Sequence, residues 1–202
     1  MINHWEEALY KQKGETLERN YLNDKKKIKN TKLMLNYVEK MVQLNSSSLV
    51  LEIGCNLARN LREVYSRYGC RVVGCDINKE CIEKCQKHFG DKGIFVKCDL
   101  RDLSFFKQYK DNAFDLGLSM DFLLHIPQGD LKKEMMREFL RICKNACLFE
   151  MFIPGKKDYF EDNQWSASFE DYRIYNKNFI LTDINNGSHD NYRLFFIKTN
   201  NP

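Results

Sequence analysis

Short runs of mostly apolar residues recur along the chain, and several of them end at a glycine or an acidic residue. Five runs have the length of a buried strand: residues 49–53, 71–75, 94–98, 114–119 and 146–152. Runs of this length, rich in β-branched and aromatic residues and bounded by turn residues, are typical of strands buried on both faces. The pattern therefore predicts five interior strands.

Between these runs, apolar positions repeat every three or four residues, which is typical of helices with one buried face. Such stripes lie in residues 31–44, 57–68, 79–89 and 131–142. Asn78 can cap the start of one helix, and Gly69 and Gly90 stand where two helices should end. The last stripe consists of Leu131, Met135, Phe139 and Ile142.

Strands and helices that alternate in this way predict an α/β fold, with helices on both faces of a mostly parallel sheet. Two further runs, residues 179–184 and 192–198, have no helix between them and predict a C-terminal antiparallel hairpin. We expect a Rossmann-like, seven-stranded sheet in residues 45–202, preceded by an N-terminal helical segment, residues 1–44. Residues 154–172 lack a clear period, which favours a long loop.

The composition is that of a folded chain, with 43% hydrophobic and 30% charged residues. The net charge of +4 does not indicate a nucleic-acid partner, because such partners favour a clustered basic stripe. One short basic cluster, residues 25–29, is interpreted as a solvated helix face or turn. No apolar run approaches the ~20 residues of a membrane span, and the N-terminus has no apolar signal core. We therefore expect a soluble, cytoplasmic protein without a membrane partner, and its oligomeric state stays open.

The eight cysteines lie mostly inside apolar runs, where reduced thiols behave as small hydrophobic residues. Cys81, Cys85 and His88 could share one helix face, but no fourth residue with zinc spacing accompanies them. No metal is therefore expected.

Acidic residues mark the ends of three successive strands. They are Glu52, Asp76 and Asp99. In an open parallel sheet, ligands bind beyond the carboxyl ends of the strands, where the strand order reverses. Asp76 suits the two hydroxyls of a ribose, and Asp99 suits an exocyclic amine such as that of adenine. Each acid could instead cap a helix.

The turn after the first strand is poor in glycine. Gly54 opens it, but Asn56 and Ala58 stand where a dinucleotide-binding turn has further glycines. Asn56 tolerates left-handed backbone angles better than most residues, and Ala58 is small enough for close packing. Together with the acidic strand ends, this turn favours a nucleoside that carries a positive charge and no pyrophosphate.

Four segments of the chain resemble the successive motifs of class I S-adenosylmethionine-dependent methyltransferases. They are residues 50–56, 73–77, 96–100 and 114–119. Shorter segments are similar to the methylases associated with pseudaminic acid biosynthesis. These are residues 4–7, 18–20, 54–56, 59–61 and 124–127. The resemblance implies S-adenosylmethionine as the cofactor and, in its narrower form, a sugar-type hydroxyl or amine as the acceptor.

The resemblance assigns cofactor contacts to ten positions. They are Glu52, Gly54, Cys55, Asn56, Asp76, Ile77, Asp99, Leu100, Ser119 and Met120. The first four match the first motif, in which Cys55 and Asn56 would supply backbone groups near the amino-acid end of the cofactor. Asp76 and Asp99 match the acids that bind the ribose and the adenine edge, and Ile77 packs on adenine. The last two positions end the fourth strand, where the methyl group faces the acceptor.

His125 is the candidate general base, because it follows the fourth strand on the ligand side and histidine titrates near neutral pH. A histidine packed against the adjacent helix is the alternative. Asp121 is the second candidate, and it could instead cap a helix. Trp5, Tyr10 and Tyr21 suggest an N-terminal lid over the cofactor, because aromatic faces attract a sulfonium. Ordinary packing of this segment on the sheet is the alternative.

Methyl transfer from a sulfonium is an in-line displacement, in which the protein mainly aligns the reactants in a dry pocket. We expect a methyltransferase that acts on a small molecule, such as a sugar or a nonulosonic-acid intermediate. A nucleic-acid or protein methyltransferase and a non-catalytic S-adenosylmethionine-binding module stay open as alternatives. Residues 119–122 read Ser-Met-Asp-Phe, which differs from the Asn/Asp-Pro-Pro-aromatic motif of enzymes that methylate base amines.

Overall fold

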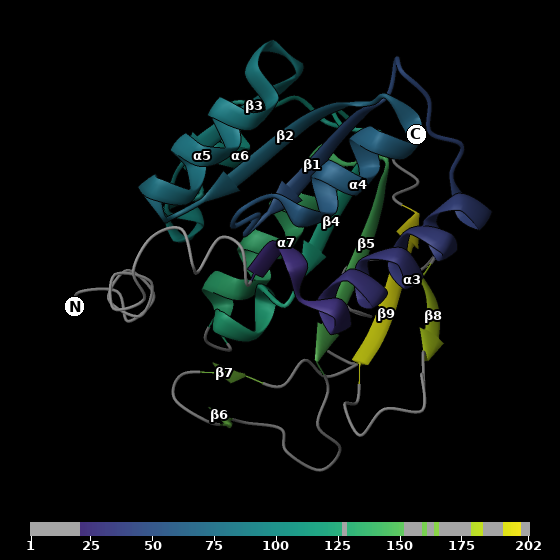
Figure 1. Ribbon diagram of the computed structural model, residues 1–202. Helices are drawn as coiled ribbons and strands as arrows, with labels where there is room; N and C mark the ends of the chain where they lie inside the picture. Colours follow the sequence, from purple (N-terminus) through teal and green to yellow (C-terminus); the bar gives the residue numbers. More distant parts are fainter. Residues whose placement is uncertain are drawn as a thin grey trace.

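The computed structural model describes residues 21–126, 129–151, 159–160, 164–165, 179–183 and 192–198 (Figure 1). Its strands are β1 (Leu49–Ile53), β2 (Arg71–Asp76), β3 (Gly93–Lys97), β4 (Leu116–Met120), β5 (Asn145–Met151), β6 (Tyr159–Phe160), β7 (Gln164–Trp165), β8 (Phe179–Asp183) and β9 (Tyr192–Lys198). Its α-helices are α3 (Lys25–Met41), α4 (Arg59–Tyr68), α5 (Lys79–Phe89), α6 (Ser104–Lys107) and α7 (Asp130–Ile142). Short 3-10 helices are η1 (Gly90–Lys92), η2 (Leu100–Asp102) and η3 (Leu123–His125).

One large sheet runs through the molecule in the order β3-β2-β1-β4-β5-β9-β8. The strands from β3 to β5 pair in parallel, whereas β9 pairs antiparallel with both of its neighbours. The chain adds β2 and β3 on one side of β1 and then crosses over to place β4 on the other side. The strand order therefore reverses between β1 and β4, which is where ligands bind in open α/β sheets.

The predicted α/β, Rossmann-like architecture is confirmed: the sheet is mostly parallel and ends in a C-terminal antiparallel hairpin. Several strand boundaries differ from the prediction by one residue, and two differences are larger. The fourth strand starts at Leu116 rather than at residue 114, because Phe114 makes only an isolated bridge to Cys143. Within the segment predicted as a loop, β6 and β7 pair as two short antiparallel strands.

Helices cover both faces of the sheet, with α3, α4 and α5 on one face and α6 and α7 on the other (Figure 1). Successive side chains of a strand point to opposite faces, so Val50 packs in the first layer and Leu51 in the second. The first layer also contains Val38 of α3, and the second also contains Phe139 of α7. Both sides of the central strands are therefore apolar, and polar chemistry is confined to the strand ends.

Capping residues set the ends of the helices. Helix α3 begins at Lys25, earlier than predicted, because the Asp24 carboxylate accepts the backbone N–H groups of Lys26 and Lys27 at 2.9 and 3.0 Å. The Asn78 side chain caps α5 as predicted, at 3.0 Å from the N–H of Cys81. Leu131 lies in helix α7 as predicted, but the prediction that it belongs to the buried stripe was wrong. It lies in the first turn, outside the core, and is 41% exposed.

All eight cysteines are free, and all except Cys98 are buried, as expected of thiols that pack as small hydrophobic residues. The thiols of Cys81 and Cys85 lie against Asn56, whose side-chain and backbone oxygens accept from them. His88 contacts Arg62 on the surface. None of the helices in the described ranges is both long enough and apolar enough to cross a bilayer.

Candidate functional site

A cavity of about 420 Å³ lies beyond the carboxyl ends of β1, β2 and β4, at the place where the strand order reverses. Nine of the twelve predicted site residues line it: Gly54, Asn56, Asp76, Ile77, Asp99, Leu100, Met120, Asp121 and His125. The other three, Glu52, Cys55 and Ser119, are buried behind its wall. The structure thus gathers residues that are far apart in the sequence around one hollow.

The turn between β1 and α4 has left-handed backbone angles at three positions. The φ angles are 66° at Gly54, 48° at Asn56 and 55° at Ala58. At Gly54 a Cβ atom would also overlap the ring of Phe122, so the turn depends on the missing side chain there. Asn56 replaces a glycine through the property expected of it, its tolerance of positive φ.

Asp76 joins the ends of β2 and the glycine turn. Its Oδ2 accepts the backbone N–H of Asn56 at 2.8 Å, and its Oδ1 accepts that of Asn78 at 2.9 Å. Burial raises the pKa of this carboxyl, and the amide donors lower it. Each oxygen keeps a second lone pair, so the carboxylate can still accept two hydroxyl groups from a ligand in the cavity.

Asp99 follows β3 and serves two purposes. It caps η2 by accepting the N–H of Arg101 at 3.0 Å, and its Oδ1 also accepts from the Arg101 guanidinium Nε at 2.8 Å. This pairing holds the pKa of the carboxyl below its ordinary value. The helix-cap alternative is therefore realised, while Asp99 and Arg101 both line the cavity. Sequence reasoning did not find Arg101, whose position two residues after a strand-end acid was the available signal.

Glu52 and Ser119 point away from the cavity into buried polar contacts. Glu52 is 2% exposed and accepts a hydrogen bond from the Asn60 amide at 2.5 Å. Ser119 is fully buried and donates to Glu150 on β5 at 2.7 Å. Burial raises the pKa of Glu52 to about 8 and that of Glu150 to about 7. Both acids are therefore buried behind the residues that line the cavity. Glu150 was not found from the sequence.

The raised pKa of Glu52 predicts a pH-dependent stability. Because its pKa is higher in the folded state than the ordinary 4.5, the folded chain holds this proton more tightly, and stability falls as pH rises from about 4.5 to about 8. Glu52→Gln keeps an acceptor for Asn60 and removes the proton. We expect the free energy of unfolding of the variant, measured in urea, to rise relative to that of the native chain as pH increases through this window. The difference should grow by up to about 1.4 kcal/mol per pH unit. Because other titrating groups are common to both proteins, parallel pH curves would contradict the assignment.

Asp121 and His125 line the cavity just after the end of β4. Asp121, at a left-handed φ of 53°, forms an ion pair with Lys27 at 3.0 Å. His125 lies on η3, and burial together with the charge of Lys27 lowers its pKa to about 4. The expectation that His125 titrates near neutral pH was therefore wrong, because burial and Lys27 disfavour the charged ring. The imidazole is neutral over the physiological range, and in that form it can accept a proton as a weak base.

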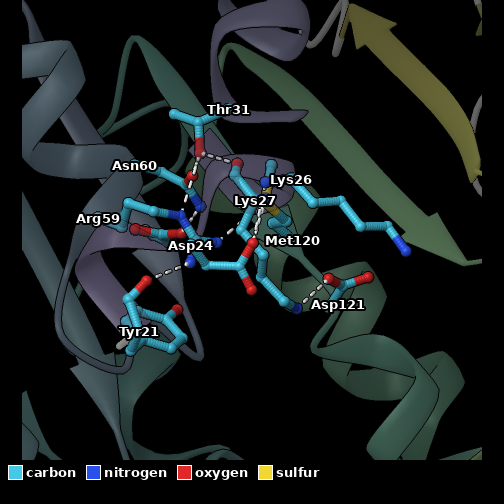
Figure 2. A network of polar contacts seen from close by, with 10 residues as sticks. Tyr21, Asp24, Lys26, Lys27, Thr31, Arg59, Asn60, Met120 and Asp121 are labelled. Atoms are coloured by element: carbon cyan, nitrogen blue, oxygen red, sulfur yellow. Dashed lines mark hydrogen bonds and ion pairs between the residues drawn. The ribbon is translucent and has the colours of Figure 1, made fainter. Parts of the chain in front are cut away.

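Cationic side chains on the N-terminal side of the cavity were missed or misread from the sequence. Lys27 belongs to the basic cluster that was interpreted as solvated, but it reaches Asp121 across the cavity wall (Figure 2). Arg59, the first residue of α4, is 7% exposed and stacks on the Tyr21 ring at 4.5 Å from its centroid. Tyr21 therefore lies at the cavity, as the lid hypothesis requires, whereas Trp5 and Tyr10 lie outside the described residues.

The central part of the chain is similar to a known protein family. Residues 50–146 match the family model described as a methyltransferase domain. This match supports the sequence-based prediction of a class I, S-adenosylmethionine-dependent methyltransferase domain, and the similarity to known methyltransferases agrees with it. The matched residues run from β1 to the start of β5 and carry most of the cavity.

Among curated proteins, the chain is similar to 24-methylenesterol C-methyltransferase 2 of Arabidopsis thaliana, with 23% identity over 127 residues, which cover 61% of this chain and 34% of the relative. It is similar in structure to phosphoethanolamine N-methyltransferase 2 of Haemonchus contortus in complex with S-adenosyl-L-methionine, with a TM-score of 0.61, 14% identity, and coverage of 77% of this chain and 39% of that one. It is also similar to geranyl diphosphate C-methyltransferase of Streptomyces coelicolor A3(2), with a TM-score of 0.64, 11% identity, and coverage of 83% and 79%.

The similarity to the curated relatives extends over about a third of their length. At 14% and 11% identity the two solved structures show a shared fold. The chain spans 34% and 30% of the length of the first curated relatives that it matches. S-adenosylmethionine is the cofactor of this class, and one of the neighbours has it bound.

Proposed function

We propose that this protein transfers a methyl group from S-adenosylmethionine to a small-molecule acceptor. The observation that carries the proposal is the cavity at the reversal of strand order, with Asp76 and Asp99 at two strand ends beside the glycine turn. A parallel sheet with an acid at successive strand ends suits a nucleoside, and the turn, with one glycine and three left-handed residues, leaves little room for a pyrophosphate.

The residues of the cavity fit the proposed cofactor. Asp76 retains acceptor capacity for the two ribose hydroxyls after binding the N–H groups of Asn56 and Asn78. Ile77 and Leu100 supply apolar surface for the adenine ring, and Asp99 lies at the same end of the cavity wall. Carboxylates also favour a ligand with a cationic centre. The cofactor contacts predicted from the sequence are kept as part of this proposal. Glu52, Cys55 and Ser119 are buried behind the cavity lining and would support the residues that contact the cofactor.

When bound, S-adenosylmethionine supplies an activated methyl group on a sulfonium. The chain then has three tasks: to orient the cofactor, to align the acceptor and to exclude water. Met120 at the end of β4 and Phe122 on the following turn place apolar surface in the cavity next to Asp121 and His125. We propose His125 as the general base that takes the proton of the acceptor at a ring nitrogen, with Asp121 as the second candidate.

A small molecule is the acceptor class that the comparisons favour. The relatives are named as enzymes of a sterol, of phosphoethanolamine and of geranyl diphosphate, all of them small molecules. The narrower resemblance to methylases of pseudaminic acid biosynthesis makes a sugar-type hydroxyl or amine our proposed acceptor. The mild net charge of +4 gives no support to a nucleic-acid acceptor.

Calorimetry and a turnover assay test the proposal together. Titration with S-adenosylmethionine and S-adenosylhomocysteine should show saturable binding at a single site. Incubation with S-adenosylmethionine and a panel of amino sugars and nonulosonic acids should then release S-adenosylhomocysteine. Binding without turnover on any acceptor would favour the non-catalytic binding module, and the absence of binding would reject the proposal.

Replacing Asp76 by alanine is expected to weaken the binding of S-adenosylmethionine by about 1–3 kcal/mol, because hydrogen bonds to a charged group are lost. Calorimetry measures the change. Asp76→Asn keeps one acceptor oxygen, so its affinity should lie between that of the native chain and that of Asp76→Ala. Asp91→Ala, at an exposed position of η1, serves as the control. Native affinity in a folded Asp76→Ala chain would refute the ribose assignment.

A further inference from the structure

Arg59 is a buried cation on the wall of the cavity. It is 7% exposed and begins α4, directly after the glycine turn. Its Nε donates to the Thr31 hydroxyl at 3.3 Å, its Nη1 to the Tyr21 carbonyl at 3.5 Å and its Nη2 to the Met120 sulfur at 3.6 Å (Figure 2). These acceptors are a hydroxyl, a distant carbonyl and a thioether, all of them neutral.

No carboxylate balances this guanidinium within the part of the chain that the structure describes, since none of the ion pairs found there includes Arg59. Glu52 is the acid that acts on it through space, but burial raises the pKa of Glu52 to about 8 and keeps it mainly protonated at neutral pH. A buried charge without a partner is costly, and an arginine fork matches a carboxylate in geometry.

We propose that Arg59 binds the carboxylate at the amino-acid end of S-adenosylmethionine and makes the cavity selective for adenosyl compounds that carry this group. The inference rests on the proposed function. The residues that line the cavity indicate how the cofactor is oriented. Asp76 and Asp99 would bind its nucleoside end, so its amino-acid end would lie toward Gly54 and Arg59. Lys27 is the other cation on this side of the cavity, and it is engaged by Asp121. The amino end of α4 adds a favourable potential for an anion.

Thr31 and Asn60 position the guanidinium. The Thr31 hydroxyl donates to the Asn60 carbonyl oxygen at 2.6 Å, and the Asn60 amide donates to Glu52, which leaves the Thr31 oxygen free to accept from Arg59 (Figure 2). The Tyr21 ring stacks on the guanidinium. The three hydrogen bonds use three of the five N–H donors, so each terminal nitrogen keeps one N–H for a ligand. The Arg59 side chain would therefore link the bound carboxylate to Tyr21, which precedes α3.

The test compares two ligands that differ only in the carboxylate: S-adenosylmethionine and decarboxylated S-adenosylmethionine. Calorimetry measures both with the native chain, Arg59→Gln and Arg59→Lys. The native chain should prefer S-adenosylmethionine by about 10–100-fold, the range expected for charged hydrogen bonds. Arg59→Gln should lose that preference by weakening the first ligand alone, and Arg59→Lys should retain part of it. Arg67→Gln, which removes the same charge from the outer part of α4, should keep the preference.

Three outcomes would overturn the proposal. Equal affinity of the native chain for both ligands would show that the carboxylate is not recognised. Parallel losses for both ligands in Arg59→Gln would show that Arg59 only supports the cavity wall. A native chain that binds neither ligand would remove the proposed function as well, whereas the first two outcomes leave that function intact.

Discussion

Replacing Gly54 by alanine is expected to lower the free energy of unfolding by about 2–5 kcal/mol and to weaken S-adenosylmethionine binding at least tenfold. Two costs add up. A left-handed φ of 66° costs an alanine roughly 1–2 kcal/mol, and the new Cβ would overlap the Phe122 ring, an overpacking that costs roughly 1–3 kcal/mol. Urea unfolding and calorimetry measure the two effects. Binding suffers because Gly54 and Phe122 both line the cavity.

Gly69→Ala separates the two costs. Gly69 has the same left-handed φ of 66°, but a Cβ placed there would make only an ordinary contact with the Ser46 Cβ at 3.7 Å. The control should therefore lose only the backbone contribution and should bind S-adenosylmethionine normally. In the Gly54→Ala background, Phe122→Ala should recover part of the lost stability, because it removes the overlapping ring. Equal destabilisation by both glycine substitutions would contradict the steric part of the argument.

Local patterns were sufficient to predict the sheet and the helices packed on it. The five interior strands are continuous apolar runs because each is covered on both faces, as Val50 and Leu51 show by packing in opposite layers. The ends of α4 and α5 were predicted from Gly69 and Asn78, whose effects reach only a few residues along the chain. The start of α3 was missed because the prediction followed the apolar stripe and ignored the cap at Asp24.

The candidate site was predictable only in part, for a different physical reason. Strand-end positions place a residue at the correct edge of the sheet, but they do not decide whether its side chain turns to the cavity, as that of Asp76 does, or into a buried contact, as those of Glu52 and Ser119 do. The pairing of Lys27 with Asp121 joins residues 94 positions apart, and no local pattern carries such information. Only the assembled fold brings them together.

His125 is the residue whose replacement should affect the reaction most. On the proposed function, His125→Ala should lower turnover by about 100-fold or more, the lower range for general-base catalysis, with the affinity for S-adenosylmethionine preserved. The neutral imidazole is the active form, and its pKa is lowered to about 4. Turnover should therefore be lost as pH falls through about 4, and should show no transition near 6.5. Steady-state rates with saturating cofactor, measured across this range, give both quantities.

Two variants distinguish this role from structural packing. His88→Ala removes a histidine that contacts Arg62 away from the cavity, and it should leave turnover unchanged. Asp121→Asn removes the competing base and its ion pair with Lys27 while keeping the size of the side chain. If Asp121→Asn abolishes turnover and His125→Ala does not, the proton goes to Asp121, and the buried His125 is a packing residue of η3. If His125→Ala alone removes the reaction while the affinity for S-adenosylmethionine is kept, the proton goes to His125.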